Sequence, residues 1–373
     1  MKKIIETARS KAMQVLTTCS TEHGIYASCY TDGYTSVWAR DSMITMIGAS
    51  SHSDVFEKVF RKSIETLATH QSKKGQIPND VDIFENRKLV TFATIDSSLW
   101  FLLGEAAYKK KFGNALWKKH KKNIQKAITW VEYQDAGEDM LPEQQPTSDW
   151  MDCFPHKYGH TINTQALYYA ALKALGRKKI IKKFKKNADE KLWSKKLGYY
   201  LPWHWKDHNA YEEKEEWFDS LGNMLTICYG LADSKQAKSI LNFVEKKGIA
   251  KPFPMRAIFP TIKPDSKEWK EYFKSCLAGT PGDYLNGGIW PFIGGFYICA
   301  LVETKQFSKA EKALELLAKA NKLAKAKNQN WDFNEWIHPK SKSAKGGRFQ
   351  SWSAGGYLLA YEAVKQKKNP IKI

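Results

Sequence analysis

Helical periodicity recurs along nearly the whole 373-residue chain and limits its fold more than any other sequence feature. Apolar residues return at three- and four-residue spacing, as at Leu99, Leu102 and Ala106, and Gly, Pro and Asn separate the segments. Two aromatic, β-branched stretches, 24–38 and 199–205, predict short strands or hairpins instead. The pattern predicts twelve helices, at residues 2–18, 41–50, 54–70, 96–112, 116–133, 161–175, 178–193, 216–231, 235–247, 285–304, 307–327 and 350–366.

Twelve helices in consecutive pairs, with no Pro/Gly-rich linker between them, indicate an all-α fold. We expect an (α/α)6 barrel, in which six helical hairpins close into a ring and short β-hairpins lie in the loops. The inner helices of such a ring would be apolar on every side, and the outer helices would be half solvated. No sequence signature repeats at a fixed period, as it would in an open solenoid. The sequence therefore predicts a single domain over residues 1–373.

The basic composition raises the question of a nucleic-acid partner, because the formal net charge is +20. However, only seven of the 59 lysine and arginine residues are arginine, on which base reading and bidentate phosphate binding mostly depend. The lysine runs at 178–186 and 322–327 fall on the polar faces of predicted helices. We therefore expect a solvated surface and no specific nucleic-acid partner.

Membrane and cofactor signals are also missing from the sequence. No run of eighteen apolar residues occurs, and the first residues do not resemble a signal peptide, so we expect a cytoplasmic protein without membrane contact. The six cysteines form neither a CxxC pair nor a Cys/His cluster, and there is no GxGxxG or Walker A motif. We expect no metal and no cofactor. The oligomeric state stays open.

The predicted connections place tryptophans beside carboxylate, amide, imidazole and guanidinium side chains. A pyranose ring offers an apolar face for stacking and a rim of hydroxyls for hydrogen bonds, and this combination of side chains suits both. The sequence therefore predicts a small-molecule carbohydrate as the ligand. The candidate binding residues in these connections are Trp38, Arg40, Asp41, Trp150, His204, Asn286, Trp290, Gln350 and Trp352.

Two carboxylic residues stand out in aromatic surroundings, and hydrolysis of a glycosidic bond needs two carboxyl groups, one on each side of the bond. Asp152 lies between Trp150 and the Phe154–Pro155 pair, a setting that would raise its pKa and keep it protonated. Glu335 lies in a similar setting, the segment 333–336 (Phe-Asn-Glu-Trp). A loop carboxylate can equally cap a helix or pair with a lysine, so context alone leaves both interpretations open.

Motifs in one consistent order carry a family resemblance. The segments are 37–41, 96–100, 152–167 (Asp-x5-Tyr-Gly-x5-Gln-Ala-Leu), 217–223, 285–291 (Leu-Asn-Gly-Gly-Ile-Trp-Pro) and 349–358 (Phe-Gln-Ser-Trp-Ser-Ala-Gly-Gly-Tyr-Leu). They resemble the alkaline/neutral invertases, six-hairpin glycosidases that hydrolyse sucrose with inversion, from about residue 25 to 366. The segment 71–79 (Gln-x3-Gly-Gln-Ile-Pro-Asn) is shared more widely, with debranching-type amylo-α-1,6-glucosidases and related barrels.

The resemblance implies roles for individual residues. It implies that Asp152 is the general acid and Glu335 the general base. Trp38, Arg40 and Asp41 would line the floor of the subsite for the glycone, the sugar whose bond is cut. It places four further residues around that subsite, namely Gln165, Asn286, Trp290 and Gln350. For Gln165 and Gln350, a purely structural hydrogen bond at a helix end remains an equal alternative.

Three departures from the invertase pattern concern the leaving-group side of the pocket more than the reaction. Cys153 and Phe154 replace an Arg-Arg pair, Asn163 replaces a Glu, and the loop between Glu335 and Gln350 is shorter. We therefore expect an inverting glycosidase that acts on an α-glucosidic bond, with sucrose as the first substrate. An α-glucosidase or debranching-type enzyme on oligosaccharides is the alternative. A helical toroid that binds glycans without cleaving them is the alternative from another class.

Overall fold

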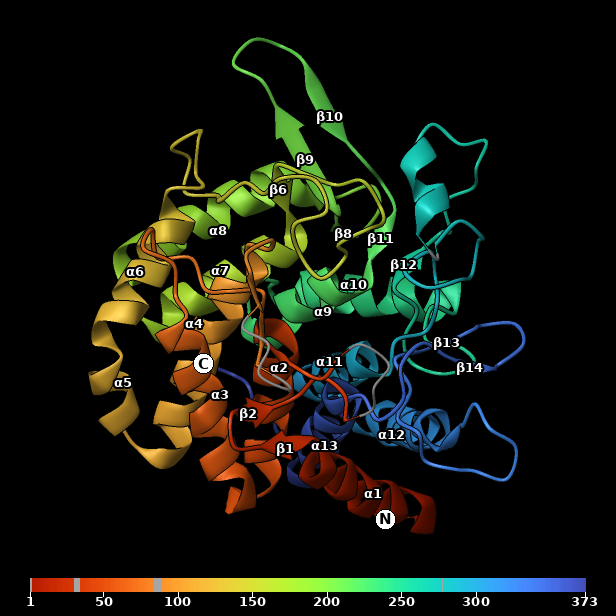
Figure 1. Ribbon diagram of the computed structural model, residues 1–373. Helices are drawn as coiled ribbons and strands as arrows, with labels where there is room; N and C mark the ends of the chain where they lie inside the picture. Colours follow the sequence, from red (N-terminus) through yellow and green to blue (C-terminus); the bar gives the residue numbers. More distant parts are fainter. Residues whose placement is uncertain (1, 30–33, 84–88, 277) are drawn as a thin grey trace.

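The computed structural model of the protein describes residues 2–29, 34–83, 89–276 and 278–373 (Figure 1). Its helices are α1 (Lys3–Cys19), α2 (Ala39–His52), α3 (Glu57–Thr69), α4 (Asp96–Phe112), α5 (Ala115–Lys119), α6 (Lys121–Glu132), α7 (Ile162–Ala174), α8 (Lys178–Leu192), α9 (Ser220–Tyr229), α10 (Ser234–Lys247), α11 (Pro291–Glu303), α12 (Phe307–Lys322) and α13 (Ser351–Gln366). Two short 3₁₀ helices are η1 (Asp54–Phe56) and η3 (Glu271–Ser275).

The strands are short and lie in the connections. They are β1 (Ser20–Thr21), β2 (Gly24–Ile25), β3 (Val37–Trp38), β4 (Asp80–Asp82), β5 (Leu89–Thr91), β6 (His160–Thr161), β7 (Trp193–Ser194), β8 (Tyr199–Tyr200), β9 (Trp203–Lys206), β10 (Glu212–Lys214), β11 (Phe218–Asp219), β12 (Ile258–Phe259), β13 (Trp336–Ile337) and β14 (Ala344–Lys345). All pair antiparallel, in the sets β1–β2, β3–β4–β5, β6–β9–β10, β7–β8, β11–β12 and β13–β14.

Every second long helix belongs to a closed inner ring. The helices α2, α4, α7, α9, α11 and α13 each pack on the next, and α13 packs on α2 again. The remaining long helices lie outside this ring: α3 packs on α2 and α4, α6 on α4, α8 on α7, α10 on α9, and α12 and α1 on α13. This closure confirms the predicted (α/α)6 barrel with short β-hairpins in its loops.

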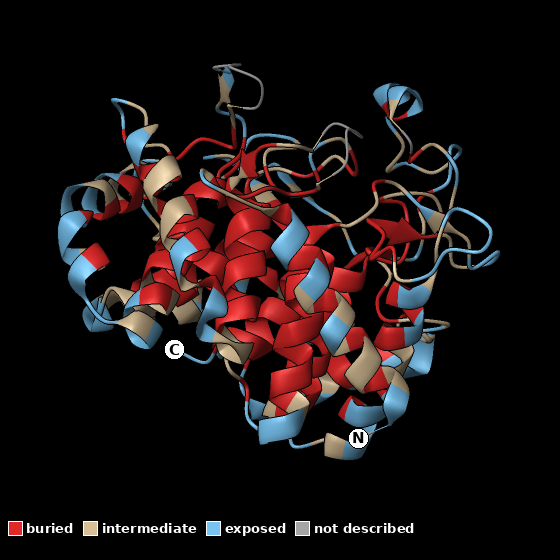
Figure 2. Cartoon of the chain, turned by 60° about the horizontal axis from the view of Figure 1, so that its bottom comes forward, coloured by how far each residue is buried: buried red, intermediate tan, exposed pale blue. Residues whose placement is uncertain are grey.

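Burial separates the inner from the outer helices. Every residue of α9 is buried, and so is every residue of α11 except Glu303. The outer helix α8 buries only Phe184, Ala188 and Leu192, one residue per turn. Figure 2 shows the consequence, a buried centre enclosed by helices whose outer surfaces are exposed. Among the described residues, no helix is long and apolar enough to span a membrane.

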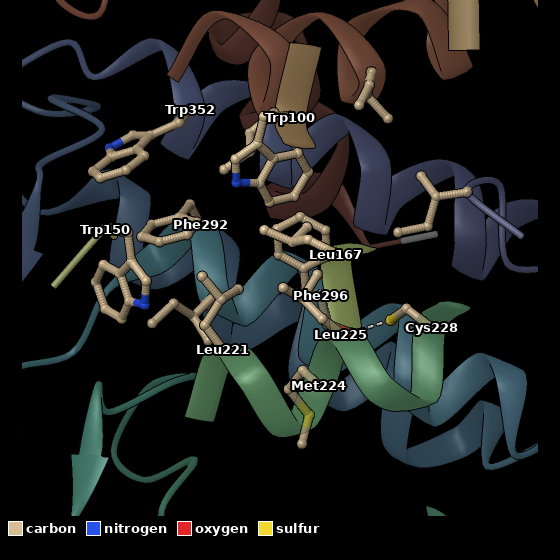
Figure 3. Packing of buried hydrophobic residues seen from close by; sticks show 14 of the residues in the cluster. Trp100, Trp150, Leu167, Leu221, Met224, Leu225, Cys228, Phe292, Phe296 and Trp352 are labelled. Carbon is tan, nitrogen blue, oxygen red and sulfur yellow. Dashed lines mark hydrogen bonds between the residues drawn. The ribbon is translucent and has the colours of Figure 1, made fainter. Parts of the chain in front are cut away.

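Aromatic side chains from different inner helices fill the barrel (Figure 3). The rings of Phe292 on α11 and Trp352 on α13 stack with centroids 4.2 Å apart and planes 11° apart. Trp150 packs edge-on against Phe292 at 5.4 Å, and Trp100 on α4 meets Phe296 at 6.0 Å. Such ring pairs add to the hydrophobic stabilisation of the barrel.

Several predicted helix boundaries were wrong, for reasons that lie in the surrounding structure. The helix predicted at 285–304 begins only at Pro291, which occupies the first helical turn, where a missing N–H costs nothing. The helix predicted at 216–231 begins at Ser220, because Phe218 and Asp219 pair with β12 as a strand.

Two more helices differ from the prediction. The segment predicted at 116–133 divides into α5 and α6 at His120, whose Nδ1 lies 2.6 Å from the buried Glu105 carboxylate. The helix predicted at 307–327 ends at Lys322, because Leu323 adopts an extended ψ of 145°. The predicted β stretches contain β2 and β3 (24–38) and β8 and β9 (199–205), and residues 30–33 lie outside the described part.

The inner helices begin directly after the segments that carry the predicted site residues. Trp38 precedes α2, Trp290 precedes α11 and Gln350 precedes α13, each as the N-cap residue. Helix N-termini carry unpaired N–H groups and a partial positive charge, which favours carboxylates nearby. The ring therefore brings a set of helix N-termini to the predicted site.

We expect the contact between α2 and α13 to tolerate no added atom. A Cβ at Gly355 would lie 2.5 Å from the Thr45 Cα, because the two helix backbones touch there. Gly355→Ala should therefore lower the free energy of unfolding by about 1–3 kcal/mol, as overpacked cores do. Chemical denaturation measures this. Gly137→Ala is the control, since its Cβ would meet nothing closer than 3.7 Å, and equal losses in both variants would contradict the close packing.

Candidate active site

A buried ion pair joins the first turns of two neighbouring inner helices. Arg40 on α2 is 4% exposed, and its Nη1 donates to both carboxylate oxygens of Asp96, at 3.2 and 3.1 Å. Asp96 is the first residue of α4 and is fully buried. The other terminal nitrogen, Nη2, lies 3.9 Å from the Oδ2 of Asp152. The structure thus places Asp152 beside Arg40.

Glu335 is held in the connection between α12 and β13. Its side chain is buried, and its Oε2 accepts a hydrogen bond of 2.8 Å from the backbone N–H of Gly347. The backbone N–H of Glu335 in turn donates to the Gly347 carbonyl at 2.9 Å. The other oxygen, Oε1, accepts a long hydrogen bond of 3.5 Å from the Tyr34 hydroxyl. One oxygen is therefore fixed, and the other is weakly engaged.

Three carboxyl groups of the site interact electrostatically. Burial raises the pKa of Glu335, and the charge of Asp152 raises it further, against the Gly347 hydrogen bond. Burial also raises the pKa of Asp152, where Arg40 opposes the shift and Asp96 adds to it. The pKa of Asp41 rises to about 7, because burial and the charges of Glu335 and Asp152 outweigh Arg40. Close carboxyl groups disfavour one another's ionisation, so this group retains protons that isolated carboxyls would lose.

Exposure separates the three carboxyl groups. The Asp152 side chain is 45% exposed, whereas Asp41 and Glu335 are 6% and 5% exposed. An accessible carboxyl with a raised pKa can donate a proton to a bound molecule, and a buried carboxylate with a weakly engaged oxygen can accept one from water. The arrangement therefore has the two components of acid–base catalysis.

Two tyrosines that the sequence analysis missed belong to this group. Burial raises the pKa of Tyr34 and of Tyr284, and the charge of Glu335 raises both further. Both hydroxyls therefore stay protonated and can donate hydrogen bonds. Tyr284 packs against Trp290 at 5.2 Å and against Trp336 at 6.1 Å. Its position just before the Asn-Gly-Gly-Ile-Trp-Pro motif was the available signal.

The predicted tryptophans contact residues of the site, but three of the four are almost fully buried. Trp290 donates its indole N–H to the Tyr284 carbonyl at 3.2 Å, and its ring contacts Trp150 at 5.5 Å and Trp352 at 5.8 Å. Trp150, Trp290 and Trp352 are each at most 6% exposed. Trp38 is only half-buried and meets Tyr34 edge-on at 6.0 Å. Of these four tryptophans, Trp38 is the most exposed.

The predicted amides hold loops in place. Asn286 is fully buried, accepts from the Ile262 N–H at 2.8 Å, and donates to the carbonyls of Ile262 and Ala278 at 2.8 and 3.1 Å. Gln165 donates to the Pro142 carbonyl at 2.7 Å. The Gln165 Oε1 and the Gln350 Nε2 are buried and have no hydrogen-bond partner among the described residues. These two atoms are therefore free of hydrogen bonds from the described residues, and each could bind a polar group of a ligand.

His204 is not brought to the carboxyl groups of the site. It lies on β9, where its Nε2 is 2.9 Å from Glu212 and its ring stacks with His160 at 6.3 Å. Burial lowers the pKa of His204, and Glu212 opposes that shift. Its contacts are those of the β6–β9–β10 sheet.

Two of the residues that depart from the invertase pattern, Phe154 and Asn163, are buried, whereas the shorter loop at 336–349 is mostly half-buried or exposed. Phe154 is fully buried and packs edge-on against Phe273 of η3 at 4.6 Å. The carbonyl of Cys153 accepts a weak hydrogen bond of 3.8 Å from the Cys276 thiol. Asn163 is also fully buried. In the described part of the chain, no group of three or more His, Cys, Asp or Glu residues could hold a metal ion.

A closed ring of six helical hairpins with interacting carboxyl groups at the start of its inner helices defines a class, the six-hairpin glycoside hydrolases. Residues 11–359 match the family described as amylo-alpha-1,6-glucosidase, and the chain belongs to that family.

Sequence relatives include plant invertases. Alkaline/neutral invertase E, chloroplastic, of Arabidopsis thaliana is 30% identical over 146 residues, which are 38% of this chain and 22% of that protein. The probable alkaline/neutral invertase A, chloroplastic, of the same plant is 24% identical over 361 residues, which are 81% of this chain and 56% of that protein. The matched part is thus well short of either relative's full length.

Solved structures share the fold. A GH63 mannosylglycerate hydrolase from Thermus thermophilus matches with a TM-score of 0.70 and 14% identity, covering 94% of this chain and 99% of that chain. A bacterial glucoamylase complexed with acarbose matches with a TM-score of 0.68 and 13% identity, covering 98% of this chain and 56% of that chain. At these identities the likeness concerns the fold.

The raised pKa of Asp41 predicts that this residue lowers stability at neutral and alkaline pH. The folded protein keeps the Asp41 proton up to a pH of about 7, whereas the unfolded chain loses it near its ordinary pKa. The stability contributed by protonation is therefore present in acid and is lost as the pH rises through about 7.

Asp41→Asn stays neutral at every pH and does not lose this stability. From about pH 4 to pH 8, the unfolding free energy of the variant minus that of the natural protein should therefore rise by at least about 1 kcal/mol. Denaturant titrations at both pH values measure this. A stability gain independent of pH would contradict the raised pKa.

If Asp41 binds sugar hydroxyls, the same variant should lose more than about tenfold in kcat/KM.

Proposed function

We propose that this protein is an inverting glycosidase in which Asp152 is the general acid and Glu335 the general base, and that residues 1–373 form one catalytic domain. The observation that carries the proposal is the pairing of an accessible carboxyl, Asp152, with a buried carboxyl, Glu335, whose charges interact. The raised pKa of Asp152 suits an acid that must hold its proton near neutral pH.

The proposed reaction uses each side chain at a defined step. Asp152 gives its proton to the glycosidic oxygen as the bond from that oxygen to the anomeric carbon breaks. A water molecule on the opposite face forms the new bond to the anomeric carbon and gives its proton to Glu335. The weakly engaged Oε1 of Glu335 is the accepting atom, since Oε2 is bound to Gly347. Arg40, 3.9 Å from Asp152, stabilises the carboxylate that Asp152 becomes.

In this proposal Trp38, Arg40 and Asp41 form the floor of the glycone subsite. Asp41 offers a buried carboxyl for sugar hydroxyls, and half-buried Trp38 offers the face of its ring. A protein that only bound glycans would gain nothing from several buried carboxyls that disfavour one another's ionisation. The geometry therefore favours catalysis over a purely binding toroid.

Sucrose is the first proposed substrate, because the motifs and the sequence relatives point to invertases. A specific observation supports the alternative, an oligosaccharide substrate. A cavity of about 610 Å³ opens beside the Asp152 loop (residues 146–158), within the range that holds ligands larger than one hexose. Neither Asp152 nor Glu335 lines this cavity, so it would hold only sugar units beyond the bond that is cut. Pro155 and Tyr158 of its walls come from the Asp152 loop, and Trp217 comes from the segment before β11. The other walls come from the β9–β10 hairpin and the segment before η3. Figure 1 shows that hairpin projecting beyond the ring.

A substrate panel distinguishes these functions. We expect the purified protein to release glucose from at least one of sucrose, trehalose, maltose, isomaltose and glucosylglycerate. Turnover of sucrose favours the invertase-like function, and faster turnover of maltose or isomaltose favours the oligosaccharide alternative. Released monosaccharide is measured enzymatically. Binding of a sugar without turnover of any substrate would contradict the proposal and favour the glycan-binding toroid.

The roles of the acid and the base predict an asymmetry between two variants. Asp152→Asn and Glu335→Gln should each lower kcat by about 10²–10⁴, the usual value of a positioned acid or base, with circular dichroism unchanged. α-Glucosyl fluoride needs little protonation of its leaving group. It should therefore restore much of the rate of Asp152→Asn and little of the rate of Glu335→Gln. Equal rescue of both variants would contradict the assignment of Asp152 as the acid and Glu335 as the base.

The stereochemical outcome is measured by nuclear magnetic resonance of the first-formed sugar. A water between the two carboxyls gives inversion, so an α-glucoside should yield β-glucose first. Initial release of α-glucose would show a retaining mechanism.

We further propose a cytoplasmic location and a surface whose lysines serve solvation. Seven of the fifteen residues of the outer helix α8 are lysine, and none of the three residues that this helix buries is charged. Its lysines therefore keep their charges in water, as they would on a solvated face. Specific nucleic-acid binding is not part of this proposal.

A further inference from the structure

Lys157 is a fully buried lysine close to the acid. Its Nζ lies 2.8 Å from the Oδ2 of Asp149 and 3.4 Å from the Oδ2 of Asp219, and all three side chains are 0% exposed. Lysine is almost never fully buried unless it is paired. Well-packed apolar residues in place of such a cluster would often be as stable or more stable. Stability alone is therefore a weak reason for these three charges.

Both carboxylates of the cluster also hold backbone. The other oxygen of Asp149 accepts the N–H of Met151 at 2.9 Å, directly before Asp152. The other oxygen of Asp219 accepts the N–H of Gly222 at 3.0 Å and so caps the inner helix α9. Lys157 thus joins the two ends of the segment 149–157 to each other and to the inner ring.

Asp152 lies within this segment, between its two anchored ends. The segment contains neither helix nor strand at Asp152, so the position of the carboxyl depends on contacts of the segment rather than on a regular element. Phe154 holds one side of it against Phe273. Displacement of a catalytic group by about 1 Å can cost about 10²-fold in rate.

We propose that Lys157, through its ion pairs with Asp149 and Asp219, is a positioning residue that fixes the Asp152 carboxyl for proton transfer. This inference rests on the proposed role of Asp152 as general acid. In it, neither Lys157 nor its partners touch the substrate. Their effect reaches the reaction only through the place and the charge state of Asp152.

The cluster also acts on Asp152 through its field. Burial raises the pKa of Asp152 most, and Arg40 opposes that shift. The charges of Asp96 and, to a smaller extent, Asp149 raise the pKa further. Removing the charge of Asp149 should lower the pKa of Asp152, so the enzyme should lose its protonated acid at a lower pH. The titratable and charged groups that interact with Asp152 are Arg40, Asp41, Asp96, Asp149, Cys153, Tyr34, Tyr284 and Glu335.

The test compares Asp149→Asn and Lys157→Met with the natural protein, on a glycoside that the natural protein hydrolyses and on α-glucosyl fluoride. Asp149→Asn keeps the shape of the side chain and its acceptor for the Met151 N–H, so it should fold even if Lys157→Met does not. We expect kcat on the glycoside to fall about 10- to 100-fold while KM changes little. The fluoride should recover most of the rate, and the alkaline limb of the pH profile of Asp149→Asn should move to lower pH.

Glu105→Gln is the matched control. It breaks another buried polar contact, the hydrogen bond of Glu105 with His120, about 13 Å along α4 from Asp96. It should lower stability without changing the pH profile or the ratio of the two substrate rates.

Each outcome decides one question. Folded Asp149→Asn and Lys157→Met with unchanged kcat and pH limb would overturn the positioning role, and so would a loss equally large on the fluoride. If the natural protein hydrolysed no glycoside, or if Asp152→Asn kept full activity, the proposed function itself would fail.

Discussion

Two buried cations, Arg40 and Lys157, make it possible for this barrel to gather carboxylates at the start of its inner helices and in the connections before them. Arg40 compensates Asp96 and lies beside Asp152, and Lys157 compensates Asp149 and Asp219. A single unpaired carboxylate in such surroundings would be strongly destabilising, because burial removes its hydration. With the two cations in place, the connections between helices can bring further carboxyls to the same region.

The compensation is incomplete, and the surplus of negative charge has a chemical consequence. The pKa values of Asp41, Asp152 and Glu335 are all raised, first by burial and then by neighbouring carboxylates. The helix N-termini and Arg40 favour ionisation but do not cancel these effects. Groups that compete for few protons are suited to exchanging them, which is why such clusters occur at functional sites. The same competition for protons lowers the stability of the protein at neutral pH. Functional sites commonly lower stability in this way.

The sequence predicted the ring because inner and outer helices bury different faces, and this difference is local in the chain. It also indicated Asp152, Glu335, Arg40 and Asp41 as candidates, since each lies in a short motif with aromatic neighbours, and their roles stay predictions. It could not predict that Lys157 meets Asp219, because that pair is 62 residues apart and the motifs that contain the two residues, 152–167 and 217–223, give no sign of their contact. Tyr34 was missed because its partner Glu335 is 301 residues away in the chain. Tyr284 was missed because it lies just outside the motif 285–291. The tryptophans were predicted as stacking surfaces, but Trp150, Trp290 and Trp352 mostly pack on one another, since burial depends on tertiary contacts.

The two halves of the site are built from different parts of the fold. Arg40, Asp41 and Asp96 belong to first turns of ring helices, so their relative positions are fixed by the packing of the barrel. The cavity beside the Asp152 loop is formed instead by the β9–β10 hairpin and the segment before η3, which project from the ring. Connections tolerate changes of length and sequence that packed helices do not. The ring helices therefore fix Arg40, Asp41 and Asp96, whereas Asp152 and Glu335, the proposed acid and base, lie in connections. The segment 149–157 connects the two parts, because Lys157 ties it to the ring and it also forms one wall of the cavity.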